Sequence, residues 1–132
     1  MRIVVAPDKF AGTLTAPQAA AAIAAGWKRA DPTAELIELP MADGGPGFVD
    51  VLHAGVGGRL VPVQVSGPFG EPVTARLLLD GTTAYVEAAQ ACGLVLTGGR
   101  TPERASTYGV GELVLAARAA GATRIVVGLG GS

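Results

Sequence analysis

Three short segments of the chain that carry charged side chains, glycines or both follow apolar runs. They are Asp8-Lys9, Asp43-Gly44-Gly45 and Gly130-Gly131-Ser132. Glycines let backbone amides approach an anion, while carboxylate and ammonium groups can bind a metal ion and neutralise phosphate. Loops at the carboxyl ends of strands surround the ligand crevice of an α/β sheet, so these segments predict an anion-handling enzyme site.

The charged residues suit phosphoryl transfer, and two roles are open for the acids. Lys9 could offset phosphate charge, whereas Asp8 and Asp43 could orient a substrate hydroxyl as a base or bind Mg²⁺, with Asp43 as the candidate metal ligand. The pattern does not distinguish which aspartate is the base. The structural alternatives are that Asp8 and Lys9 lie in a surface loop and that Asp43 caps the following helix.

A fourth candidate segment opens the last helical pattern of the chain. Its amides could bind a carboxylate or phosphate, as helix N-termini do. The candidate binding residues there are Thr107, Tyr108, Gly109 and Gly111. Equally, Ser106 or Thr107 could serve only as the N-cap, with Tyr108 packing nearby.

Other familiar catalytic motifs are missing from the sequence. Gly99 stands where a phosphate-binding loop of the Walker type requires lysine, and no dinucleotide fingerprint follows the first apolar run. His53 lies at helical spacing from Asp50, which favours a solvated helix residue over a catalytic base. Cys92 has no second sulfur or histidine near it in sequence, which favours a small buried residue.

The first part of the chain predicts a βαβ unit. Residues 2–6 are an apolar run suited to a strand buried on both faces. Thr15 and Gln18 form a capping box before a helix over residues 16–30, and residues 34–39 predict a second strand. Within the helix, Ile23 and Trp27 are expected to mark the inner face.

A second helix and a change of period follow. Phe48, Val51 and Leu52 have helical spacing, and Gly57-Gly58 should end that helix. Period-two alternation then predicts an antiparallel or mixed section in which Asp80-Gly81 makes a hairpin turn. The last elements expected are a helix over residues 106–120 and a strand over residues 124–129.

Composition restricts the classes of function. The 132 residues are 49% hydrophobic, which is enough to bury one core. Ten basic residues nearly balance eleven acidic ones without a basic run, which argues against nucleic-acid or electrostatic membrane partners. The single cysteine suits a reducing compartment, and no leader or membrane-spanning run occurs. We therefore expect a cytoplasmic protein that acts on small molecules.

Six segments, in order, resemble the amino-terminal part of bacterial glycerate kinases of the type-1 family. They are Ala6-Pro7-Asp8-Lys9-Phe10, Met41-Ala42-Asp43-Gly44-Gly45, Gly67-Pro68-Phe69-Gly70-Glu71, Glu87-Ala88-Ala89, Ser106-Thr107-Tyr108-Gly109-Val110-Gly111-Glu112 and Gly128-Leu129-Gly130-Gly131-Ser132. The resemblance covers essentially the whole chain. It implies ATP-dependent phosphorylation of glycerate, with magnesium, in a cleft between two α/β domains.

The chain departs from the pattern of the family it resembles at four positions. Lys9 stands where the family often has serine, and Ala11 stands where it has lysine, so the positive charge has moved along the loop. Pro46 replaces a glutamate after the two glycines, and Cys92 replaces serine. Family members also continue well beyond the position of Ser132.

The resulting prediction is an α/β fragment of a glycerate kinase, inactive in isolation. A Rossmann-like βαβ first lobe spans residues 1–58, and residues 59–132 begin a mixed-sheet second lobe that is truncated at Ser132. Glycerate and ATP are the expected partners, 2-phosphoglycerate is the favoured product, and an uncovered strand edge favours a homo-oligomer or a low-stability monomer. The alternatives are a non-catalytic module that binds glycerate or a nucleotide, and a kinase for a related small sugar acid.

Overall fold

The computed structural model describes residues 1–99 and 102–132 and divides into two compact units, Met1–Asp43 and Gly44–Ser132. The sequence pattern had placed a boundary after residue 58. The compact units divide earlier because helix α2 (Phe48–Val56) packs against strands β4 and β5 of the second unit. The domain limits of the protein as a whole stay a prediction.

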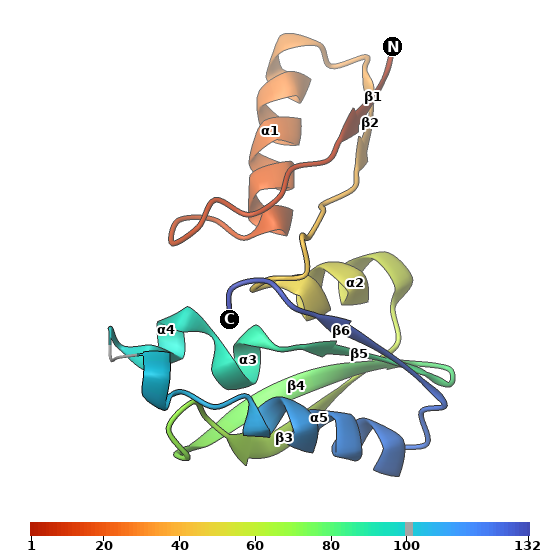
Figure 1. Ribbon diagram of the computed structural model, residues 1–132. Helices are drawn as coiled ribbons and strands as arrows, with labels where there is room; N and C mark the ends of the chain where they lie inside the picture. Colours follow the sequence, from red (N-terminus) through yellow and green to blue (C-terminus); the bar gives the residue numbers. More distant parts are fainter. Residues whose placement is uncertain (100–101) are drawn as a thin grey trace. The chain divides into compact units, whose positions relative to one another are not determined.

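The first unit is a βαβ unit, as expected from its sequence (Figure 1). Strand β1 (Arg2–Val5) pairs in parallel with β2 (Glu35–Glu38), and helix α1 (Ala16–Ala30) connects them and packs against both. The capping box is present: the Gln18 amide donates to Thr15 Oγ1 at 3.3 Å, and the Thr15 amide donates to Gln18 Oε1 at 2.9 Å. These two bonds satisfy amides that the helix itself leaves unpaired.

The buried faces of this unit differ from two expectations. Helix α1 contacts its neighbours through alanines rather than through Ile23 and Trp27, which are 44% and 41% exposed. The buried residues of the helix are Ala16, Ala19, Ala20 and Ala24. Strand β1 is not buried on both faces, because Val4 is 58% exposed while Val5 is 5% exposed. The cause is that α1 covers one face of this two-stranded sheet.

The second unit is built on a mixed sheet, which confirms the predicted change of period. The strand order is β3 (Arg59–Ser66), β4 (Pro72–Asp80), β5 (Thr83–Glu87) and β6 (Arg124–Gly128). The first three strands run antiparallel, and β6 is parallel to β5. A tight turn containing Gly81, with φ of +55°, joins β4 to β5 at the predicted hairpin.

Helices lie on both faces of this sheet (Figure 1). Helix α5 (Tyr108–Ala119) covers the face that carries the main core, and α2 covers the opposite face through contacts such as that of Phe48 with Tyr85. The core consists of Val65, Ala75, Leu77, Leu79, Ala84, Val86, Ala91, Leu113 and Ala117. Alternation along the strands therefore sorts side chains to α5 or α2.

The remaining helical segments are single turns that connect β5 to α5. They are α3 (Ala89–Cys92), α4 (Leu94–Thr97) and the 3₁₀ turn Pro102–Arg104. Among residues 1–99 and 102–132, no helix has the length and hydropathy needed to cross a membrane.

The capping box gives a direct test of the first unit. Replacing Thr15 by alanine removes the acceptor for the Gln18 amide and should lower the free energy of unfolding by about 1 kcal/mol. Chemical denaturation measures this change. Thr13→Ala is the matched control, because Thr13 is exposed and its side chain makes no hydrogen bond within the part of the chain that the structure describes. Equal effects of the two variants would contradict the capping role.

Candidate functional site

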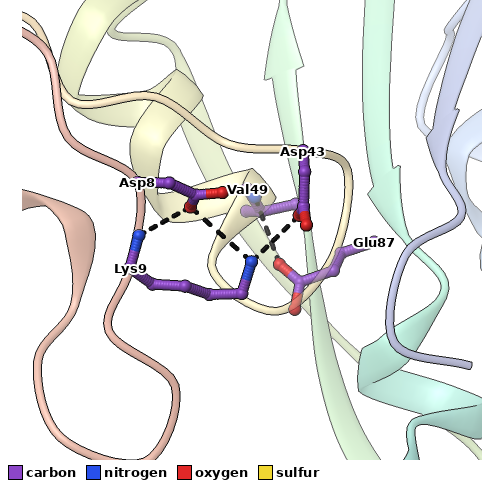
Figure 2. A network of polar contacts seen from close by, with 5 residues as sticks. All are labelled: Asp8, Lys9, Asp43, Val49 and Glu87. Atoms are coloured by element: carbon purple, nitrogen blue, oxygen red, sulfur yellow. Dashed lines mark hydrogen bonds and ion pairs between the residues drawn. The ribbon is translucent and has the colours of Figure 1, made fainter.

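The structure brings three of the predicted site residues together in the first unit. Lys9 Nζ lies 2.9 Å from Asp43 Oδ1 and 3.6 Å from Asp8 Oδ1 (Figure 2). The backbone amide of Lys9 also donates to Asp8 Oδ1 at 2.6 Å. We call these residues the Asp8–Lys9–Asp43 cluster. It places one ammonium group between two carboxylates, one from the neighbouring residue Asp8 and one from Asp43, which lies 34 residues after Lys9.

Parallel pairing of the first two strands explains why this cluster forms. The ladder continues past the strand ends, because the Leu39 amide donates to Val5 O at 2.8 Å and the Met41 amide donates to Pro7 O at 2.9 Å. The two segments therefore leave the sheet side by side at its carboxyl edge. The residues that come next on each segment are those of the cluster.

The charges of the cluster are held at a partly open surface. The Lys9 side chain is 22% exposed, while those of Asp8 and Asp43 are 40% and 61% exposed. The hydrogen bond to Asp43 raises the pKa of Lys9 above its ordinary value of 10.5; burial opposes this and the charge of Asp8 adds to it. Lys9 is therefore a cation at neutral pH, and the solvent can reach the carboxylates around it.

The predicted glycine loops meet in the second unit, where packing requires glycine. The Gly130 amide donates to Gly44 O at 3.1 Å. A Cβ on Gly130 would lie 2.6 Å from the backbone nitrogen of Gly45, and a Cβ on Gly131 would lie 2.7 Å from Pro46 Cδ. The loops thus approach backbone to backbone, and the Gly130 amide already has a partner. Anion binding by the loop residues stays a prediction.

The helix that follows the Asp43 loop is bonded at its start by Glu87, a residue that the sequence pattern did not single out as a site. The N-cap of α2 is Gly47 rather than Asp43, and Gly47 has no side chain to cap with. Instead the Val49 amide donates to Glu87 Oε2 at 3.2 Å (Figure 2). Glu87 is 5% exposed at the end of β5. A lone carboxylate that closes an apolar strand is the signal that could have identified it.

At the start of α5 a side chain bonds one backbone amide, and anion binding by this segment stays a prediction. Ser106 Oγ accepts the Tyr108 amide at 3.1 Å, whereas Thr107 in the N-cap position makes no side-chain cap. Gly109 lies directly against β3, since a Cβ there would overlap Ser66 O, whereas a Cβ on Gly111 would meet no atom within 4 Å. Tyr108 is 68% exposed and does not pack as expected. The last predicted site residue, Ser132, is not part of this segment. Its Oγ donates to Leu129 O at 3.3 Å.

The remaining reactive side chains have ordinary surroundings. Cys92 is 8% exposed and its Sγ lies 3.4 Å from Ala88 O, which confirms a small buried residue. His53 is half-buried on α2. Among the described residues, no group of three or more histidine, cysteine, aspartate or glutamate side chains could hold a metal ion.

The Lys9 ion pair makes a prediction about pH. Because its pKa is raised in the folded protein, the stabilisation from this pair is present below pH 10.5 and is lost as pH rises through the Lys9 pKa. In an Asp43→Asn variant the pKa of Lys9 should fall, since the largest cause of the shift is removed. NMR titration of the Lys9 side chain measures this. An unchanged titration midpoint would show that Asp43 does not hold Lys9 in solution.

Two glycines of α5 allow the close packing of this helix against β3 to be tested. Gly109→Ala should cost about 1–3 kcal/mol of stability, because the new methyl group would overlap the backbone of β3. Gly111→Ala, the matched control two residues later, meets no atom within 4 Å and should stabilise the helix by about 0.5–1 kcal/mol. Denaturant melts of both variants test the difference. Equal stability of the two variants would rule out the close contact at Gly109.

Comparison with known proteins agrees with the resemblance seen in the sequence. The model of the glycerate kinase family matches residues 3–132. A glycerate kinase of Bacillus subtilis (strain 168) is 46% identical and a glycerate 2-kinase of Escherichia coli (strain K12) is 41% identical. In both cases the match covers 100% of this chain and 36% of the relative.

A solved structure shows the same fold. The structure of glycerate kinase 2 from Salmonella typhimurium LT2 superposes with a TM-score of 0.81 at 40% identity, over 100% of this chain and 36% of that one. This likeness bears out the α/β class with its parallel and mixed sheets. The chain thus spans about a third of the length of the relatives it matches. On the family match over residues 3–132, the chain belongs to the glycerate kinase family.

Proposed function

We propose that the protein to which this chain belongs transfers a phosphoryl group from ATP to glycerate in the cytoplasm. Family membership supports a kinase, and the named relatives supply the acceptor. The product is proposed to be 2-phosphoglycerate, because the Escherichia coli relative is a glycerate 2-kinase. The observation in this chain that carries the proposal is the Asp8–Lys9–Asp43 cluster at the carboxyl edge of the parallel β1–β2 pair.

The cluster contains the groups that phosphoryl transfer requires. The transition state spreads negative charge over the transferring phosphoryl oxygens, so a fixed cation lowers its energy. Lys9 is such a cation, and its ammonium is held from two sides. A carboxylate next to the acceptor hydroxyl can take its proton as the oxygen attacks phosphorus. We assign this role to Asp43, whose side chain is the more exposed of the two aspartates, and we assign Asp8 to holding Lys9.

Magnesium fits the donor set of the cluster. Mg²⁺ binds through one or two carboxylates and completes its shell with water and substrate phosphates, so it needs no group of three acidic side chains. If the ion binds here, Asp43 would hold it in place of acting as the base, and Asp8 would keep its contact with Lys9. When bound, Mg²⁺ would neutralise charge on the phosphates of ATP.

The two alternatives are less well supported. A module that only binds glycerate or a nucleotide is not favoured, because the named relatives are kinases. A kinase for another small sugar acid rests on Pro46, which stands beside the glycine loop where it contacts Gly131. A panel of small hydroxy acids, assayed for ADP release with the full-length protein, separates these functions. Turnover confined to an acid other than glycerate would reject the proposed substrate.

Replacing Asp43 tests the catalytic assignment. Asp43→Asn keeps the size of the side chain but removes the charge needed by a base or a metal ligand. Turnover of glycerate should fall by about two to four orders of magnitude, as for a lost general base. Stability should change little, because an exposed ion pair contributes about 0–1 kcal/mol. Steady-state kinetics and thermal melts of the full-length protein measure both effects.

Asp50→Asn is the matched control for this variant. Asp50 is 52% exposed in its side chain and pairs with Arg76 at 3.0 Å, so Asp50→Asn loses a similar ion pair within the second unit. Its turnover should stay near that of the unmodified protein. An Asp43→Asn variant as active as Asp50→Asn would reject Asp43 as base and metal ligand.

A further inference from the structure

Glu87 is a buried carboxylate for which the proposed chemistry has no role. It is 5% exposed, and no ion pair of Glu87 occurs among residues 1–99 and 102–132. Burial of a charged carboxylate is costly unless hydrogen bonds or opposite charge compensate. Its compensation comes from the Val49 amide, which donates to Oε2 at 3.2 Å within the first turn of α2. The positive end of the helix dipole stabilises the same charge.

Helix α2 needs this contact because its own N-terminus lacks a cap. Gly47 at the N-cap position is in the left-handed region, with φ of +94°, and offers no side-chain acceptor. The Phe48 amide is satisfied by Gly45 O at 3.0 Å, and the Val49 amide is satisfied by Glu87. A strand residue 38 positions later thus replaces the missing local cap.

A second contact joins the same turn to the same strand. The rings of Phe48 and Tyr85 meet edge to face, with centroids 6.4 Å apart. Tyr85 and Glu87 lie two residues apart on β5 and so share one face of the sheet. The first turn of α2 therefore contacts β5 through two residues on the same face of the strand, Tyr85 and Glu87. The glycine loop that precedes this turn, residues 44–47, is held between these contacts and the close approach of Gly130.

We propose that Glu87 is a positioning residue that fixes the N-terminus of α2 and, through it, the glycine loop of residues 44–47. The role rests on the proposed function, because this loop directly follows in sequence Asp43, the residue to which catalysis is assigned. Glu87 also occupies the positive end of α2. A phosphate on the same amides would meet a like charge, which disfavours anion binding at the N-terminus of α2.

Amide hydrogen exchange tests the structural part of the proposal without reference to activity. In Glu87→Ala, amides of residues 45–50 should exchange about five- to tenfold faster, the equivalent of a lost helix cap. Glu87→Gln keeps an oxygen acceptor for Val49 and should lie between Glu87→Ala and the unmodified protein. Unchanged exchange in both variants would overturn the proposal. If Glu87→Ala does not fold, Glu87→Gln alone decides it.

Kinetics of the full-length protein test the positioning role. In Glu87→Ala, kcat/KM for glycerate should fall roughly ten- to a hundredfold, mainly through KM, and glutamine should restore part of it. Glu71→Gln is the matched control, because Glu71 also accepts a backbone amide, that of Phe69 at 3.0 Å, in the β3–β4 turn. It should leave both constants unchanged.

The outcomes distinguish a failure of the Glu87 proposal from a failure of the proposed kinase function. Faster exchange with unchanged kinetics, measured well below the melting temperature, would reduce Glu87 to a purely structural cap and overturn the positioning role. A loss of kcat in Glu87→Gln as large as in Glu87→Ala, with normal exchange, would overturn it as well, because Glu87 would then act on the reacting atoms. An unmodified protein that does not phosphorylate glycerate would reject the proposed function, and the exchange experiment would still decide whether Glu87 fixes the loop.

Discussion

Parallel strand pairing is the constraint on which the candidate site depends. In a parallel pair both strands end at the same edge of the sheet, so the residues that follow them are brought together. Val5 of β1 pairs with Glu38 of β2, and the segments beyond them carry Lys9 and Asp43. In the second unit the same geometry pairs Glu87 with Gly128. The candidate site residues of this chain therefore lie at strand ends, where ligands bind in other α/β folds.

Glycine has two separate uses at these strand ends. At Gly130 the backbone of one loop lies so close to another that a methyl group would overlap it. Such contacts, together with the hydrogen bond from the Gly130 amide to Gly44 O, fix the loops relative to each other. Amides of the same loops that have no partner could still bind an anion. The number of glycines in a loop does not indicate how many such amides exist, because each amide must be accessible. The Gly130 amide is not, since it already donates to Gly44 O.

Asp43 and Glu87 differ in burial, and this difference determines what each carboxylate can contact. Asp43 is exposed and paired with an ammonium group, so its charge is available to solvent and substrate. Glu87 is buried and bonded to a helix amide, so its charge is used within the fold. On the proposed function, the same carboxylate chemistry serves reaction at Asp43 and positioning at Glu87. Solvent access decides between these uses, because water and substrate compete only for exposed oxygens.

The local elements could be predicted from the sequence because their signals lie within a few residues. The capping box at Thr15, the hairpin at Gly81 and the end of α2 at Gly57 all rest on short-range hydrogen bonds and backbone conformation. The family, too, follows from ordered motifs along the chain. Asp8, Lys9 and Asp43 could be selected because their charges directly follow apolar strands.

Tertiary structure alone decided which surfaces are buried and which carboxylate is enclosed. Ile23 and Trp27 have the spacing of an inner face, yet alanines make the contact of α1 with its sheet. Glu87 caps a helix 38 residues before it, and Gly109 is required by a carbonyl of β3. Burial and close contact depend on which segments become neighbours. Neighbours distant in sequence leave no local pattern, which is the physical reason that these features could be recognised only in the folded chain.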